Sequence, residues 1–229
     1  MRPLPRPLEL VEKIILETQP TAVWVALSSG GCGILTRAMV GRHDEDFRET
    51  RSTGLEFAHG VVQAISFAPS PHRVSTPQIL VDAADAVIDD PEHVCLYGTT
   101  WQCLPDGVEI CSVGTNSVLV FEKGDLQEVI VPHSINELLR SQGRALHPLG
   151  RQVATHALGS RKSARSCGVD DVRVAHVPLA PTTTIAIIED RRLADAIIQF
   201  AVPRNELPAF IEAWNSPGKR IRTSVLLSL

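Results

Sequence analysis

The sequence contains no long apolar run and no excess of basic residues. Its longest uncharged, apolar stretch covers residues 21–33, well short of the roughly 20 residues that a membrane-spanning helix needs. Lysine and arginine number 22 and aspartate and glutamate 26, so the formal net charge is −4, whereas a general nucleic-acid binder needs a basic surface. The N-terminus has basic residues but lacks the apolar region of a signal peptide. We therefore expect a soluble, cytoplasmic protein that binds neither nucleic acid nor a membrane.

Cysteine is scarce and histidine is scattered. The five cysteines show no C-x-x-C spacing, which argues against a zinc ribbon, a redox motif or a disulfide framework. We expect most of them to be small buried apolar residues. The eight histidines, His133 and His156 among them, lack the H-x-H and H-x-x-x-H spacings of metal ligands. Surface or hydrogen-bonding roles are therefore expected for them.

Apolar residues are abundant enough for a substantial core. They make up 44% of the chain and charged residues 21%, a balance typical of a folded protein. No repeat, low-complexity tract or long linker divides the sequence, and its length fits one domain. We expect a single domain over residues 1–229, with residues 1–19 as an N-terminal extension that contains a helix.

Segments with helical spacing alternate with short β-branched segments. The helical pattern predicts helices at 8–17, from Ser52 or Thr53 to Ile65, and at 78–88, 135–142, 191–200 and 206–214. Apolar segments bounded by turn residues predict strands at 21–27, 94–100, 107–113, 117–122, 125–131, 172–177, 182–188 and 223–229. The consecutive hairpins imply antiparallel sheets. We therefore expect an α+β fold, a four-layer αββα sandwich of two antiparallel sheets flanked by helices.

Several short motifs follow one another in an order known from one enzyme family. They are residues 25–31 (VALSSGG), 97–100 (YGTT), 108–124, 132–134 (PHS), 153–159 (VATHALG), 177–190 and 220–227 (RIRTSVLL). This order resembles that of the metal-dependent protein Ser/Thr phosphatases (PPM, type 2C) over residues 20–229. The resemblance implies the αββα sandwich that the predicted elements also indicate.

The acidic residues of the family motifs are largely replaced. In the family, carboxylates of three motifs bind two Mg²⁺ or Mn²⁺ ions, and metal-bound water attacks the phosphate. In this sequence Leu27 and Arg220 stand at two of the aspartate positions, and Thr115 stands at the acid of a third motif. Asp190 keeps its carboxylate, but Arg191 follows it in place of glycine. The resemblance therefore implies a vestigial site without metal.

The family's opening "R…NED" strands have no counterpart before residue 20, so its phosphate-binding arginine is also expected to be missing. We expect no catalytic residue, and Asp190 is the only candidate metal ligand. An ion pair between Asp190 and Arg220 is expected to close the site. The vestigial site comprises Leu27, Ser28, Ser29, Gly30, Gly31, Thr115, Asn116, Asp190 and Arg220.

Three segments have two interpretations. The glycine-rich residues 28–33 form either a tight turn or an anion-binding loop in which Cys32 is a candidate nucleophile. The polar residues 41–52 form either a solvated charged loop or, through Asp44–Asp46, a relocated set of metal ligands. The basic residues 160–168, at the place of the family's mobile flap, form either a flexible solvated loop or a partner contact.

Because the site and not the fold makes the chemistry, the replaced acids favour a pseudophosphatase without cofactor. We expect such a protein to be regulatory, with a kinase or a phosphoprotein as its partner. The alternative is a divergent metal-dependent phosphoprotein phosphatase that binds Mg²⁺ or Mn²⁺ through Asp190 and Asp44–Asp46. A hydrolase of the N-terminal-nucleophile type is disfavoured, because no Ser, Thr or Cys follows a recognisable processing point.

Overall fold

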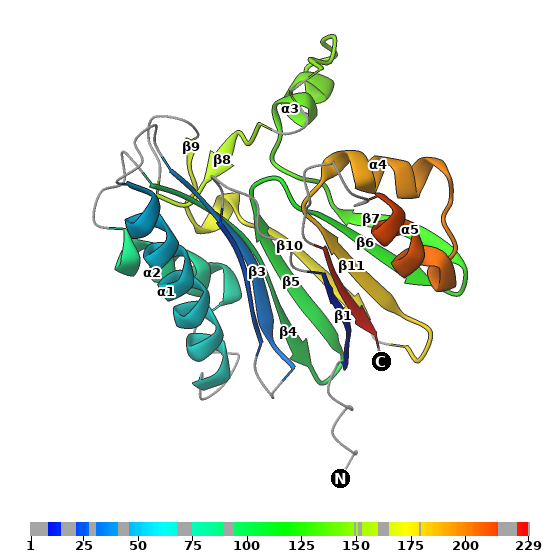
Figure 1. Cartoon of the computed structure of the whole chain (residues 1–229), viewed down its shortest axis with the longest axis horizontal. Helices are drawn as coiled ribbons and strands as arrows, with labels where there is room; N and C mark the ends of the chain where they lie inside the picture. Colours follow the sequence, from blue (N-terminus) through cyan, green and yellow to red (C-terminus); the bar gives the residue numbers. More distant parts are fainter. Residues whose placement is uncertain are drawn as a thin grey trace.

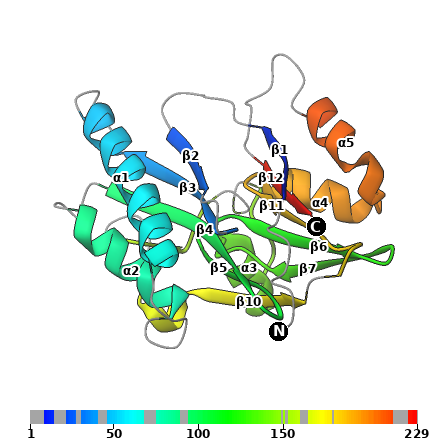
Figure 2. The same cartoon turned by 90° about the horizontal axis from the view of Figure 1, so that it is seen from below.

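The computed structural model describes residues 9–14, 22–27, 31–40, 46–67, 75–88, 94–148, 150, 153–159, 165–178, 180–214 and 224–228. Two five-stranded sheets face each other, with a helix pair on the outer side of each (Figures 1 and 2). This arrangement is the αββα sandwich that the sequence predicts. Among the described helices, none combines the length and the apolarity that crossing a bilayer requires.

Both large sheets are antiparallel throughout. In the first sheet the strand order is β1 (Glu9–Ile14), β12 (Ser224–Ser228), β11 (Thr184–Ile188), β6 (Ser117–Glu122) and β7 (Asp125–Ile130). In the second sheet it is β10 (Arg173–Pro178), β5 (Gly107–Val113), β4 (Val94–Leu104), β3 (Gly33–Val40) and β2 (Ala22–Leu27). The short strands β8 (His156–Ala157) and β9 (Arg165–Ser166) pair in parallel beside them.

The helices belong to different layers. Helices α1 (Asp46–Phe67) and α2 (Thr76–Val87) cover the second sheet, whereas α4 (Arg191–Gln199) and α5 (Leu207–Trp214) cover the first (Figure 2). Helix α3 (Ile135–Ser141) covers neither sheet and extends away from both (Figure 1). Two single 3₁₀ turns, Val169–Asp171 and Arg204–Glu206, complete the described helical segments.

The core has three apolar layers, because the sheets are covered on both faces. On β6, Val118 and Val120 pack between the sheets, whereas Leu119 packs under α4 and α5. Successive side chains of a strand point to opposite faces, so a strand that is buried on both faces is apolar at every position. On the second sheet, Phe57 and Leu80 belong to the layer beneath α1 and α2. Four of the five cysteines are buried, as expected, and Cys103 is half-buried.

The first predicted element is wrong. The spacing of Leu10, Val11 and Ile14 predicts a helix over residues 8–17, but residues 9–14 form β1, which pairs with β12. Periodicity alone does not separate a short helix from a short strand, and pairing with the far end of the chain decides here. A strand therefore does precede residue 20, where the motif comparison expects none.

The segment before α1 also differs from the prediction. The strand β3 is not predicted, although it is central enough to pair with both β2 and β4. Helix α1 begins at Asp46 rather than at Ser52 or Thr53, so the second half of the expected loop 41–52 is helical. The remaining predicted helices and strands are confirmed, with bounds that differ by up to four residues.

Candidate functional site

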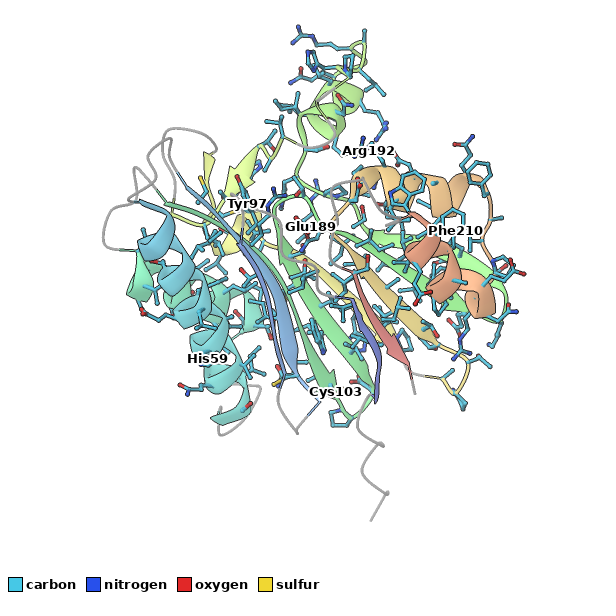
Figure 3. All side chains as sticks on the ribbon, viewed as in Figure 1. His59, Tyr97, Cys103, Glu189, Arg192 and Phe210 are labelled. Carbon is cyan, nitrogen blue, oxygen red and sulfur yellow. The ribbon has the colours of Figure 1, made fainter. Side chains whose placement is uncertain are left out.

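Three residues of the vestigial site, Thr115, Asn116 and Asp190, lie where β11 ends and β6 begins. Ile188 pairs with Ser117 across the two antiparallel strands. The residues after Ile188 and those before Ser117 must therefore emerge at the same end of the first sheet. Asp190 therefore shares this end of the first sheet with Thr115 and Asn116. Figure 3 labels Glu189, Arg192 and Tyr97 at this end of the sandwich.

Asp190 is buried and caps a helix. Its Oδ1 accepts a hydrogen bond from the backbone N–H of Arg192 at 3.0 Å, and it is the N-cap residue of α4. The Nε atom of Arg192 lies 3.5 Å from the same oxygen. A carboxylate in this position satisfies a backbone donor of the helix end and interacts with the helix dipole. Arg220 lies outside the described residues, so its predicted ion pair with Asp190 stays a prediction.

An ion pair that the sequence analysis missed joins the two sheets. The Arg37 guanidinium on β3 lies 2.8 Å from the Glu189 carboxylate, and Glu189 follows the last residue of β11. Glu189 is only 6% exposed and Arg37 22%. A charged residue inside an otherwise apolar strand pattern is the signal that could have identified Arg37, but β3 itself was not recognised.

A chain of neutral hydrogen bonds makes a second link between the sheets. The Asn116 Nδ2 donates to Thr99 Oγ1 at 2.9 Å, and Thr99 Oγ1 lies 2.7 Å from Ser112 Oγ. Thr99 and Ser112 are opposite each other in the pairing of β4 and β5. Asn116 and Thr115 are buried. Buried polar groups that are paired in this way keep their hydrogen bonds and give the contact between the sheets a defined geometry.

Arg191 adds a buried positive charge next to Asp190. Its Nη1 donates to Ser117 Oγ at 3.0 Å and to the Glu128 carboxylate, and its Nε lies 2.9 Å from Asp195 Oδ1. Its Nη2 lies 4.0 Å from Glu137. One guanidinium thus connects β6, β7, α3 and α4. The three carboxylates offset the charge of Arg191, and because they are engaged by the guanidinium they are not open ligands for a divalent cation.

A buried histidine holds the turn that leads to Thr115. The His133 backbone N–H donates to the Gly114 carbonyl at 2.7 Å, and its Nδ1 accepts from the Gly114 N–H at 3.4 Å. Gly114 has φ +106°, and an added Cβ would lie 2.6 Å from the Tyr97 ring, so only glycine fits. Burial lowers the pKa of His133 to about 4, helped by repulsion from Arg173 and His156. His133 is therefore neutral at pH 7.

The other candidate segments are only partly described. Leu27 ends β2 and pairs with Gly33, and Gly31 has φ +78°, as a tight turn requires. Cys32 is buried in the apolar layer, with its Sγ 3.4 Å from Ser66 Oγ. Residues 28–30, Asp44, Glu45 and residues 161–164 lie outside the described residues, so the anion-loop, relocated-ligand and flap hypotheses stay predictions.

The described residues do not fit a pair of divalent ions. Within the described ranges, no three side chains of His, Cys, Asp or Glu come together in a way that could hold a metal ion. Asp190 accepts from a helix N–H, Glu189 is paired with Arg37, and Arg191 adds a cation beside them. A hard divalent cation needs several oxygen ligands that are not already engaged by cations.

A pocket of about 700 Å³ lies elsewhere in the molecule. Its walls come from the β6–β7 turn and from the connection between α4 and α5. They are formed by Phe121, Lys123, Gly124, Asp125, Leu126, Thr182, Ile198, Ala201, Val202, Pro203, Arg204 and Asn205. None of these residues belongs to the vestigial site, so the pocket is separate from it.

Comparison with solved structures identifies the fold. No family model and no curated protein matches the sequence. The PPM Ser/Thr phosphatase MsPP from Mycobacterium smegmatis, solved in complex with cacodylate, is 14% identical with a TM-score of 0.63, over 96% of this chain and 95% of that one. The S. agalactiae serine/threonine phosphatase is 11% identical with a TM-score of 0.62, over 96% and 97%. The catalytic domain of the phosphatase PstP, in complex with two manganese ions, is 12% identical with a TM-score of 0.56, over 96% and 95%. Across almost its whole length, this chain has the fold of the PPM Ser/Thr phosphatases.

Proposed function

We propose that this protein is a pseudophosphatase, a non-catalytic PPM-fold module that binds another protein and regulates it. The observation that carries the proposal is the ion pair between Arg37 and Glu189 at the end of β11, the strand end at which the family resemblance places a metal ligand. A guanidinium paired with the carboxylate there competes directly with a divalent cation.

The surrounding groups support the same interpretation. Asp190 is used as a helix cap, and Arg191 brings a second guanidinium to this strand end. Thr115 and Asn116 offer neutral oxygen and nitrogen atoms where the family resemblance places a carboxylate. The PstP catalytic domain holds two manganese ions on this fold. Since a fold does not by itself carry a function, the replacement of the ligands is the feature from which we argue.

We infer a regulatory role from the combination of the PPM fold with the replaced ligands. We propose that the partner is a protein, either a kinase or a phosphorylated protein, and that the site needs no metal cofactor. A module of this kind acts by binding its partner protein. Its function is therefore measured as an affinity for that partner and not as a rate of turnover.

The experiment combines calorimetry with an enzyme assay. Titration with MnCl₂ is expected to give no binding heat, and p-nitrophenyl phosphate is expected to remain unhydrolysed with Mn²⁺ or Mg²⁺. Manganese-dependent turnover that is lost in Asp190→Asn and kept in the exposed control Asp125→Asn would overturn the proposal.

One observation favours the alternative of a rebuilt metal site. Glu189 and Asp190 place two buried carboxylates next to each other at one strand end. Together with Asp44–Asp46 they would offer oxygen ligands to a single Mg²⁺ or Mn²⁺ ion. Turnover or metal-binding heat in the experiment above would support this alternative.

A further inference from the structure

A short helical arm stands clear of the sandwich. It consists of α3 and the turn after it, residues 135–148, and we call it the α3 arm. Figure 1 shows it extending beyond the end of both sheets. From Arg140 to Pro148 every residue is exposed. A segment that covers no part of the core has no evident role in burying apolar surface.

The surface of the α3 arm is apolar and basic. Leu138 is 48% exposed and Leu146 44%, although leucine is among the residues most often buried. Residues 138–148 include Arg140 and Arg144 and no acidic residue, whereas the whole chain has a net charge of −4. Exposed leucines beside positive charge on a protruding segment are typical of a surface that meets another molecule.

The α3 arm is held in one conformation. Asn136 is 2% exposed, and its Nδ2 donates to the His147 carbonyl at 3.0 Å while its Oδ1 accepts from the His147 N–H at 2.9 Å. Gly143 has φ +64°, and the Arg144 N–H donates to the Leu139 carbonyl at 2.9 Å, which ends the helix with a left-handed cap. A segment that is ordered before binding loses less entropy on binding.

The acidic residue of the α3 arm is used internally. Glu137 is 16% exposed and lies 4.0 Å from the buried Arg191 at the base of the arm. It also pairs with Arg140, and the hydrogen bond between them raises the pKa of the Arg140 guanidinium. The Arg140 charge is therefore offset within the arm, and with Arg144 the arm has a net charge of +1.

We propose that the α3 arm is a docking element for a partner protein whose surface has an apolar groove bordered by carboxylates. This inference rests on the proposed function as a protein-binding module and adds the surface that binds. The leucines need an apolar groove, and Arg144 carries the positive charge of the arm that Glu137 does not offset, which an acidic border of the groove complements. Two arginines are too few for binding to nucleic acid or to an anionic membrane, which require larger basic clusters.

The first test locates the partner by photocrosslinking with the full chain in the native host. Leu146 is replaced by p-benzoylphenylalanine, and a matched control carries the same group at Leu55, an α1 leucine with 43% exposure. We expect one protein to crosslink through position 146 and not through position 55, at a peptide with an excess of Asp and Glu. A crosslink to RNA, to lipid or to a second copy of the chain, or no crosslink, would overturn the proposal.

The second test uses the partner protein that the crosslinking identifies, purified in its free form. Its affinity is measured for charge-reversal variants of this chain. Arg144→Glu is compared with Lys123→Glu, which changes the net charge equally at an exposed position of the β6–β7 turn. We expect binding to weaken about tenfold for Arg144→Glu only, with a smaller salt dependence. Equal affinities for the two variants would overturn the proposal. Phosphatase activity, in contrast, would overturn the proposed function while leaving the docking surface unaffected.

Discussion

Arg37 on β3 and Glu189 after β11 form an ion pair of 2.8 Å that joins the two sheets at the vestigial site. Arg37 lies on β3, outside the motifs that suggest the family, whereas Glu189 directly precedes Asp190 in the last residues of the motif 177–190. The pair ties groups from the two sheets together through a charge-assisted contact.

We expect the pair to contribute measurably to stability. Arg37→Ala leaves the carboxylate of Glu189 buried beside an empty site, which should lower the free energy of unfolding by about 2–3 kcal/mol. This is below the cost for a wholly buried pair, because Arg37 keeps 22% of its side chain exposed. Urea unfolding of Arg37→Ala, Glu189→Gln and the double variant measures the coupling. A coupling energy near zero would show that the two charges do not depend on each other.

Metal should not affect the stability of the fold. A ligand raises stability only if it binds the folded state, so a protein without a metal site gains nothing from the ion. EDTA is expected to leave the melting temperature unchanged, and millimolar Mg²⁺ or Mn²⁺ should not raise it. Thermal unfolding followed by circular dichroism makes the measurement. A shift of several degrees in either direction would mean that the chain has ligands outside the described site.

Acid should destabilise the protein through His133. Its pKa of about 4 in the folded state lies below the 6.5 of an unfolded histidine, so between these values the unfolded chain binds the proton more readily. The preference of the folded state for neutral His133 contributes about 3 kcal/mol to the free energy of unfolding above pH 6.5. This contribution is lost as the pH falls toward 4.

Urea unfolding between pH 7 and 4 tests this prediction against His133→Asn, whose Oδ1 is at the position of Nδ1 and can accept from the Gly114 N–H but does not titrate. Arg173, His156 and Asp171 surround the ring and remain unchanged in both proteins. The variant should show a flatter pH dependence. The same slope for both proteins would assign the acid sensitivity to other groups.

A strained residue offers a stabilising substitution. Ala201 has φ +46° at the end of α4, where the Val202 N–H donates to the Ile197 carbonyl at 3.1 Å. Glycine is favoured at this left-handed position, so Ala201→Gly should raise the free energy of unfolding by about 0.5–1 kcal/mol. The control Ala64→Gly, at an exposed position inside α1, should lower it by about 1 kcal/mol. Equal effects of the two substitutions would show that the positive φ of Ala201 does not strain the folded state.

Local sequence patterns were sufficient to predict most helices and strands, because caps and turn residues within a few positions specify where these elements begin and end. Ser134 caps α3 as predicted, since its side chain accepts from the Glu137 N–H at 3.2 Å. The hairpin strands β5 and β6 have their predicted bounds, because glycine and asparagine at the turns specify where each strand ends. The prediction of a helix at the segment of β1 was wrong because its structure depends on a distant segment. Its partner strand, β12, lies at the other end of the chain.

By itself, the sequence determined the alternation of helices and antiparallel strands, which depends on residue type and short-range order. The replacement of carboxylates at Leu27, Thr115 and Arg220, with Asp190 retained, is what the family resemblance implies and stays a prediction. Only the tertiary structure decided that Glu189 pairs with Arg37, that Asn116 bonds Thr99 in the facing sheet, and that Arg191 is surrounded by carboxylates. Such contacts depend on which strand ends meet, and the register of two packed sheets is set by burial of the whole core rather than by any local segment.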